Sequence, residues 1–199
     1  LIKRMMETSQ LPAESNAQPE EHDTTHLSVM DAEGNAVALT TSIGPSFGSR
    51  IATPELGFLY AHSYRMRADP TAEARDETEM TPTIVFQSDR PMIVIGAAGS
   101  ERIPSAILQV LSNVIDRNQS LEQAISTPRV LPLGRKLRLQ PGFSPAIVES
   151  LSSRGFQIES LVPDCSVHLG LVPAVSFDNR TKEYLGAVDP CSDGAAAGP

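Results

Sequence analysis

The sequence is poor in aromatic and basic residues, and both shortages exclude classes of partner. Among its 199 residues there is no tryptophan and aromatic residues make up 5%, so platforms for stacking bases or sugars are not expected. Lysine and arginine number 16 against 24 aspartate and glutamate residues, which gives a net charge of −8. Binding nucleic acid through its phosphates and docking to an anionic membrane both require a basic surplus. We therefore expect neither kind of partner.

Long apolar runs and clustered metal ligands are also absent from the sequence. No stretch of about 18 apolar residues is present, so we expect no transmembrane helix in this chain. Cys165 and Cys191 are too few for a disulfide scaffold or a metal site, and they form either one disulfide or two buried thiols. The four histidines show no metal-ligand spacing with cysteines or carboxylates. We expect no metal and no organic cofactor.

The composition predicts one globular domain preceded by a tail. Apolar residues make up 40% and charged residues 20% of the chain, which suits a core of ordinary size. Residues 1–8 look like the end of a helix, and residues 9–23 are rich in Pro, Ser, Asn, Gln and Glu, as flexible linkers are. The chain begins at Leu1 without an initiating methionine, so we expect it to be part of a longer protein, with any targeting signal upstream.

From Thr24 onward the apolar pattern predicts two hairpins followed by helices and further strands. The first hairpin is expected over 24–31 and 35–42, turning at Glu33-Gly34-Asn35, and the second over 81–87 and 92–98, with strands buried on both faces. A short strand is expected at 56–60 and a loop over 62–81. Helical spacing and caps predict helices over 103–117, 121–127 and 144–154, and weaker strands follow at 156–162, 171–178 and 183–188. This is an α+β chain with an antiparallel sheet and helices on one side.

Thr24 stands where the polar linker meets a strand, and this position suggests two roles for it. A threonine hydroxyl is a poor nucleophile without a neighbouring base. If Thr24 became an N-terminus, its own α-amino group, with a pKa near 7.7–8.0, would be suited to act as that base. The alternative is that Thr24 is simply a β-forming residue that starts a strand.

The segment from Gly96 to Ser100 joins a buried strand to a helix through small residues. Such a turn points free backbone N–H groups at one spot, where they are able to stabilise an oxyanion. A phosphate-binding loop is the rival interpretation, but the lysine and the spacing of a P-loop are missing.

From Thr24 onward, short motifs in order resemble the small subunit of γ-glutamyltranspeptidases. The resemblance covers nearly all of 24–199 and is carried by TTHLSVMDAEGNAVALTTS (24–42), FGS (47–49), MTPTIV (80–85), GAAGSERIP (96–104), LQVL (108–111), AISTPR (124–129) and GAVDP (186–190).

This resemblance implies a four-layer αββα sandwich of the N-terminal nucleophile hydrolase type, of which this chain supplies the C-terminal half. Members of the family cut their own precursor before the catalytic threonine, and the two parts stay together. The implied cut lies between Asp23 and Thr24, so residues 1–23 are the tail of the large-subunit region and 24–199 the small-subunit catalytic region. The large-subunit region of the same precursor is the implied partner in a heterodimer. A periplasmic or secreted location is implied for a bacterial source.

The resemblance also implies roles for individual residues. Thr24 is the nucleophile, and its freed α-amino group is the base. Ser42 stands where the family usually has a threonine whose hydroxyl hydrogen-bonds the nucleophile. Gly99 and Ser100 stand where two glycines provide the backbone N–H groups of the oxyanion hole. A serine keeps that N–H, although a positive φ is unfavourable for it.

The positions that recognise a γ-glutamyl group in the family differ here. Gly44 replaces an asparagine that contacts the ligand amine in the family. Ser63 lies in a segment where the family has side chains that accept hydrogen bonds from the ligand ammonium, and these are missing here. Thr78-Glu79 replaces a serine pair that holds the ligand carboxylate. Glu79 places a negative charge near a negative ligand group, which disfavours that ligand. Arg65, Arg67, Arg102 and Glu79 are unranked candidates for a new pocket.

We therefore predict a self-processing threonine amide hydrolase or acyltransferase with an altered acyl specificity. Its substrate would be a γ-glutamyl or other amide, whose acyl group passes through Thr24 to water or an amine. The alternative is a non-catalytic or uncleaved relative that acts as a binding or structural module.

Overall fold

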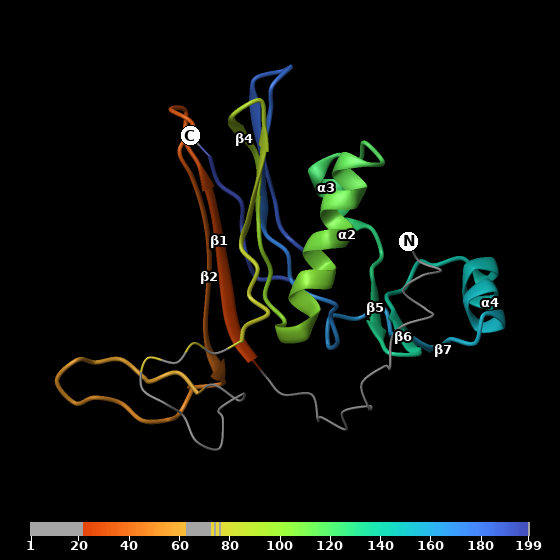
Figure 1. Cartoon of the computed structure of the whole chain (residues 1–199), viewed down its shortest axis with the longest axis horizontal. Helices are drawn as coiled ribbons and strands as arrows, with labels where there is room; N and C mark the ends of the chain where they lie inside the picture. Colours follow the sequence, from red (N-terminus) through yellow and green to blue (C-terminus); the bar gives the residue numbers. More distant parts are fainter. Residues whose placement is uncertain (1–21, 63–72, 74, 76, 199) are drawn as a thin grey trace.

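The computed structural model describes residues 22–62, 73, 75 and 77–198, which form three sheets and a set of helices (Figure 1). The predicted helix end at 1–8 and residues 9–21 of the predicted linker over 9–23 lie outside the described residues. No helix in the described ranges is long and apolar enough to cross a membrane.

The first sheet is the predicted hairpin of β1 (His22–Met30) and β2 (Ala36–Pro45). Its turn is closed by Asp31, whose carboxylate accepts from the backbone N–H of Asn35 at 2.8 Å and from its side-chain amide at 2.7 Å. The strand begins at His22 rather than Thr24, so the regular backbone extends two residues into the segment expected to be linker.

The two faces of this hairpin differ in polarity. Thr24, His26 and Ser28 alternate on the half-buried face, which lies against the second sheet (Figure 1). The opposite face is exposed and apolar, with Leu27 54%, Val29 42%, Val37 50% and Leu39 49% exposed. Among the described residues, the apolar side of the hairpin is thus the uncovered one.

The second sheet is antiparallel and has the order β3-β4-β8-β9, formed by β3 (Thr83–Gln87), β4 (Arg90–Ile95), β8 (Ala174–Asp178) and β9 (Glu183–Ala187). The prediction of burial on both faces is right for β4, where Ile93, Val94 and Ile95 are fully buried. It is wrong for β3, which is an edge strand with Phe86 60% exposed.

Two helices, α2 (Ile103–Ile115) and α3 (Leu121–Ser126), cover the face of this sheet that is turned away from the hairpin (Figure 1). Their buried residues join those of β4 and β8 in one apolar cluster that includes Ile95, Ile107 and Val110. A short 3₁₀ helix, η1 (Ser100–Arg102), precedes α2. Ser120 caps α3 through a capping box with Gln123, as the sequence predicts for this cap.

A third, smaller sheet lies beyond the helices, and of its strands the sequence predicts only the last one, at 156–162. It contains β5 (Val130–Leu133), β6 (Lys136–Leu139) and β7 (Gln157–Ser160), with the predicted helix α4 (Pro145–Ser153) between β6 and β7. The expected antiparallel sheet is the second sheet, whose strands all pair antiparallel. The third sheet adds a parallel pairing of β6 with β7, which the sequence does not predict, because the α4 crossover returns the chain in the same direction. The prediction of a short strand at 56–60 is wrong, because this segment forms only an isolated bridge between Ala52 and Leu59.

A buried ion pair joins the third sheet to the C-terminal segment. Arg129 and Asp189 are each 2% exposed and form a charge-assisted hydrogen bond between Nη2 and Oδ2. Arg129 also donates to the backbone carbonyls of Ile125 at 2.7 Å and Gly170 at 2.9 Å. The two cysteines form a disulfide, Cys165–Cys191, which settles the alternative left open by the sequence.

Removing either charge of this pair is expected to destabilise the fold strongly, because the remaining charge stays buried without its partner. Arg129→Met and Asp189→Asn should each lower the free energy of unfolding by about 3–5 kcal/mol. The double variant should lose less than the sum of the two, since it leaves neither charge unpaired. Chemical denaturation measures this, with the exposed Arg180→Met as control. Additive losses would mean that the two side chains are not coupled.

Candidate active site

Two hydroxyl groups meet at the start of the hairpin. The β1–β2 register places Thr24 opposite Ser42, and Thr24 Oγ1 donates to Ser42 Oγ at 3.0 Å. Ser42 Oγ also accepts from the backbone N–H of Gly44 at 3.2 Å. Both side chains are half-buried. The two residues that the sequence singles out as nucleophile and supporting hydroxyl are therefore in direct contact.

The polar face of the hairpin continues from this pair through His26. Its ring nitrogens lie 2.7 Å from Thr40 Oγ1 and 2.9 Å from Ser28 Oγ. Burial lowers the pKa of His26 to about 4, so the ring is neutral near pH 7. A neutral histidine with both ring nitrogens hydrogen-bonded to hydroxyl groups is suited to a structural role on this face.

His26 also connects the hairpin to the turn that follows β4. A Cβ built on Gly96 would fall 2.2 Å from the His26 ring, so the ring lies directly on the backbone of this glycine. Thr24 precedes His26 by two residues on the same strand face, and Gly96 precedes Gly99 by three. Figure 1 shows the start of β1 and the connection from β4 to α2 at the same end of the molecule.

The turn at Gly99 and Ser100 has a conformation that L residues rarely adopt. Gly99 has φ 133° and Ser100 has φ 54°, and both residues are buried. Ser100 therefore keeps the positive φ that serine disfavours. Arg102 holds this turn: its Nε donates to the carbonyl of Gly99 at 2.8 Å and its Nη1 to the carbonyl of His168 at 3.1 Å.

These contacts change the interpretation of Arg102 and reveal a residue that sequence reasoning missed. Arg102 is a candidate for a new substrate pocket by sequence, but its guanidinium is bound to backbone carbonyls. His168 belongs to a loop distant in sequence, and no local pattern marks it. Burial, with a further effect of the Arg102 and Arg129 charges, lowers the pKa of His168 to about 4.

The predicted substrate-binding positions are only partly described. Gly44 lies beside the Thr24–Ser42 pair with φ 86°, and a Cβ built on it would be 2.0 Å from the carbonyl oxygen of His62. The backbone at Gly44 therefore has no room for a side chain. Thr78 is exposed and its hydroxyl accepts from the N–H of Met80 at 3.1 Å, while Glu79 is half-buried. Ser63, Arg65 and Arg67 lie outside the described residues.

The predicted cleavage position lies in regular backbone. The peptide bond between Asp23 and Thr24 falls inside β1, next to an irregularity in pairing between His22 and Thr24. Within the described ranges, no group of three or more His, Cys, Asp or Glu side chains is placed to hold a metal ion. A hydroxyl pair at the end of the molecule that also carries the connection from β4 to α2 is an arrangement suited to acyl transfer by the chain's own groups.

Comparison with known proteins assigns the chain to a family. The model of the gamma-glutamyltranspeptidase family matches residues 2–199. The glutathione hydrolase proenzyme of Bacillus subtilis is 29% identical over 186 residues, which cover 89% of this chain and 31% of that protein. The acylase ACY 1 proenzyme of a Pseudomonas species is 33% identical over 147 residues, covering 70% of this chain and 26% of that protein. The chain thus spans about a third or less of the length of these relatives.

A solved structure gives the same assignment in three dimensions. A mutant of Helicobacter pylori gamma-glutamyltranspeptidase superimposes with a TM-score of 0.72 at 32% identity, covering 84% of this chain and 100% of that one. On the family match over almost its whole length and on this structural similarity, the chain belongs to the γ-glutamyltranspeptidase family.

Proposed function

We propose that this chain is the nucleophile-bearing part of a self-processing threonine amide hydrolase or acyltransferase. The observation that carries the proposal is the hydrogen bond between Thr24 and Ser42, at the end of the molecule where the Gly99–Ser100 turn lies. The relatives named as proenzymes support self-processing, and their names as glutathione hydrolase and acylase support amide chemistry.

In the proposed self-cleavage, the Thr24 hydroxyl attacks the carbonyl carbon of Asp23. The C–N bond of the Asp23–Thr24 peptide breaks, the acyl group moves to Oγ1 as an ester, and the nitrogen of Thr24 becomes a free amine. Water then hydrolyses the ester and releases the upstream part. Ser42 holds the attacking hydroxyl in place, since its Oγ accepts the Thr24 hydrogen bond and is itself fixed by the N–H of Gly44.

In the proposed turnover, the free α-amino group of Thr24 takes the proton from its own hydroxyl as this attacks the substrate amide. The N–H groups of Gly99 and Ser100 stabilise the oxyanion, and the proton passes to the leaving amine. An acyl-Thr24 ester remains, and water or a second amine accepts the acyl group.

We further propose that the acyl group differs from γ-glutamyl. Gly44 presents no side chain that would accept a hydrogen bond from a ligand amine, and the place of such a side chain is filled by the His62 carbonyl. Glu79 adds a negative charge at a position implied to hold a carboxylate. The similarity to a protein named an acylase, at 33% identity, supports an acyl group other than γ-glutamyl.

The large-subunit region of the same precursor is the proposed partner, and it would complete the four-layer αββα sandwich. The hairpin exposes Leu27, Val29, Val37 and Leu39 on its outer face, and an apolar sheet face of this kind is stable when another layer covers it. The relatives are about three times longer than the matched part, which leaves ample chain for that layer. We propose a periplasmic or secreted location, supported by the disulfide, because disulfides persist in oxidising compartments.

Self-processing is tested by expressing the chain together with the upstream part of its precursor. We expect a fragment that begins at Thr24 in the wild type and none in Thr24→Ala, detected by intact mass and N-terminal sequencing. Thr25→Ala is the matched control, since this threonine is exposed on the opposite face of the strand, and it should still be cut. An uncut wild-type chain would favour the alternative, a non-catalytic or uncleaved binding module.

The supporting hydroxyl is tested at Ser42. Ser42→Ala should slow both self-cleavage and amide hydrolysis about fivefold, the effect of losing one hydrogen bond worth about 1 kcal/mol at the nucleophile. Ser42→Thr keeps the hydroxyl and should stay near the wild-type rate. Thr41→Ala, one residue away on the exposed face, serves as control. Equal rates in Ser42→Ala and Thr41→Ala would remove Ser42 from the mechanism.

The acyl specificity is tested at Glu79 with two chromogenic amides. Butanoyl-p-nitroanilide should be the better substrate of the wild type, and γ-glutamyl-p-nitroanilide the poorer. Glu79→Ser should shift the ratio of their kcat/KM values toward the γ-glutamyl substrate about fivefold, because it removes a charge repulsion of about 1 kcal/mol. Glu77→Ser, exposed and two residues away, should leave the ratio unchanged. The hypothesis fails if both variants give the same ratio.

A further inference from the structure

The turn after β4 contains two peptide groups whose orientation decides where two N–H groups point. A peptide unit is planar and trans, so its carbonyl oxygen and the N–H of the following residue point in opposite directions. Holding the carbonyl of Ala98 therefore directs the N–H of Gly99. Holding the carbonyl of Gly99 directs the N–H of Ser100 in the same way.

Both of these carbonyls are held by other parts of the chain. The oxygen of Ala98 accepts from the N–H of Leu171 at 2.8 Å. The oxygen of Gly99 accepts from Arg102 twice, from Nε at 2.8 Å and from the backbone N–H at 3.1 Å. The guanidinium of Arg102 thus fixes the plane of the peptide group that contains the N–H of Ser100.

The turn depends on such support because its own conformation is unfavourable. Gly99 has φ 133° and Ser100 φ 54°, and the latter is a left-handed conformation in which a serine side chain is crowded. The bonds from Arg102 and Leu171 therefore act on a segment that would otherwise relax.

Arg102 links this turn to the loop over 165–171. Its Nη1 donates to the carbonyl of His168 at 3.1 Å, so the planar guanidinium spans the two segments. A Cβ built on Gly99 would be 3.2 Å from the Cα of Gly170 and 3.3 Å from the His168 ring. A lysine at position 102 keeps the charge but not the rigid pair of directed donors.

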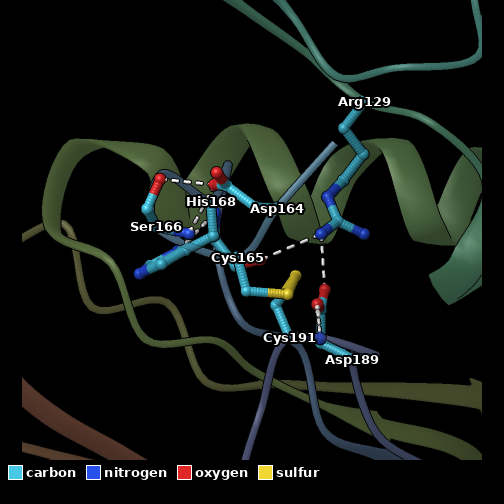
Figure 2. The surroundings of a disulfide bond; sticks show 8 residues. Arg129, Asp164, Cys165, Ser166, His168, Asp189 and Cys191 are labelled. Atoms are coloured by element: carbon cyan, nitrogen blue, oxygen red, sulfur yellow. Dashed lines mark hydrogen bonds and ion pairs between the residues drawn. A yellow bond between two sulfur atoms is a disulfide. The ribbon is translucent and has the colours of Figure 1, made fainter. Parts of the chain in front are cut away.

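The same loop is anchored on its other side. Figure 2 shows Cys165 joined to Cys191, next to the ion pair of Arg129 with Asp189. Asp189 also accepts from the N–H of Cys191 at 3.0 Å, and Arg129 donates to the carbonyl of Gly170 at 2.9 Å. Both ends of the loop are therefore fixed to the body of the molecule.

We propose that Arg102 is a positioning residue that aims the N–H of Ser100 at the oxyanion, and that the loop tethered by the disulfide supports it. This inference rests on the proposed function. Arg102 does not touch the substrate in this role: it acts through the Gly99 peptide group. Its loss should raise the barrier to forming the oxyanion without weakening ground-state binding.

The experiment compares Arg102→Lys with Arg138→Lys in the processed protein, together with its large-subunit region. Arg138 is the matched control, because it is also a half-buried arginine whose Nε donates, here to Glu159 at 3.0 Å. Release of p-nitroaniline from butanoyl- and γ-glutamyl-p-nitroanilide gives kcat and KM. The rate at which phenylmethanesulfonyl fluoride modifies Thr24, followed by intact mass, is a second readout that requires no amide substrate.

We expect Arg102→Lys to lower both kcat and the modification rate about 10- to 100-fold, while KM stays within about twofold of the wild type. The complete loss of one oxyanion donor lowers the rate about 10²–10³-fold, and a misdirected donor should lower it by less. The double variant Cys165→Ser/Cys191→Ser keeps Arg102 but removes the tether of its loop. It should also lower kcat, by a smaller factor than Arg102→Lys. The role of Arg102 would be overturned, with the proposed function intact, if Arg102→Lys had the same rates as Arg138→Lys. The same conclusion would follow if its loss of activity only accompanied a lowered Tm. A wild type that reacts no faster than Thr24→Ala would overturn the proposed function as well.

Discussion

The buried ion pair of Arg129 with Asp189 is the interaction on which the loop beside the Gly99 turn depends. Both side chains are 2% exposed, so neither charge is tolerated without its partner. The guanidinium uses its remaining donors on backbone carbonyls at the end of α3 and in the loop near Gly170. One charge pair thereby brings together segments that are 60 residues apart in sequence.

The consequences of this constraint reach the turn at Gly99. The loop that Arg129 and the disulfide hold in place supplies the N–H of Leu171 and the carbonyl of His168, and these meet Ala98 and Arg102. A second constraint acts from the hairpin, where the His26 ring lies against Gly96. The turn is thus held from two sides, by the loop and by the first sheet. A rigid support of this kind suits the proposed oxyanion site, where donors have to be oriented before the charge develops.

The chain separates the parts proposed to perform chemistry from those proposed to select a substrate. The hydroxyl pair of Thr24 and Ser42 is placed by the pairing of β1 with β2, and the turn at Gly99 and Ser100 by positive φ angles and the bonds of Arg102. The proposed recognition positions depend on side-chain identity, and the proposed change of acyl group rests on Gly44 and Glu79. The hairpin has a polar inner face and an apolar outer one, which agrees with the proposed large-subunit layer over Leu27, Val29, Val37 and Leu39.

The sequence by itself determined the first hairpin, the helices and the strands of the second sheet. Alternation and the Gly34 turn predict the first hairpin, because register follows from the turn and the apolar pattern. The contact of Thr24 with Ser42 is implied only by the family resemblance, and the β1–β2 register of the structure brings the two side chains together. The cap at Ser120 predicts where α3 begins, since a cap acts within one helical turn.

Tertiary structure alone decided the long-range contacts. The parallel pairing of β6 with β7, the pairing of Cys165 with Cys191 and the bonds of Arg102 to Gly99 and His168 join residues that no local period relates. These contacts depend on where the folded chain brings distant segments together, and only the packed structure specifies that.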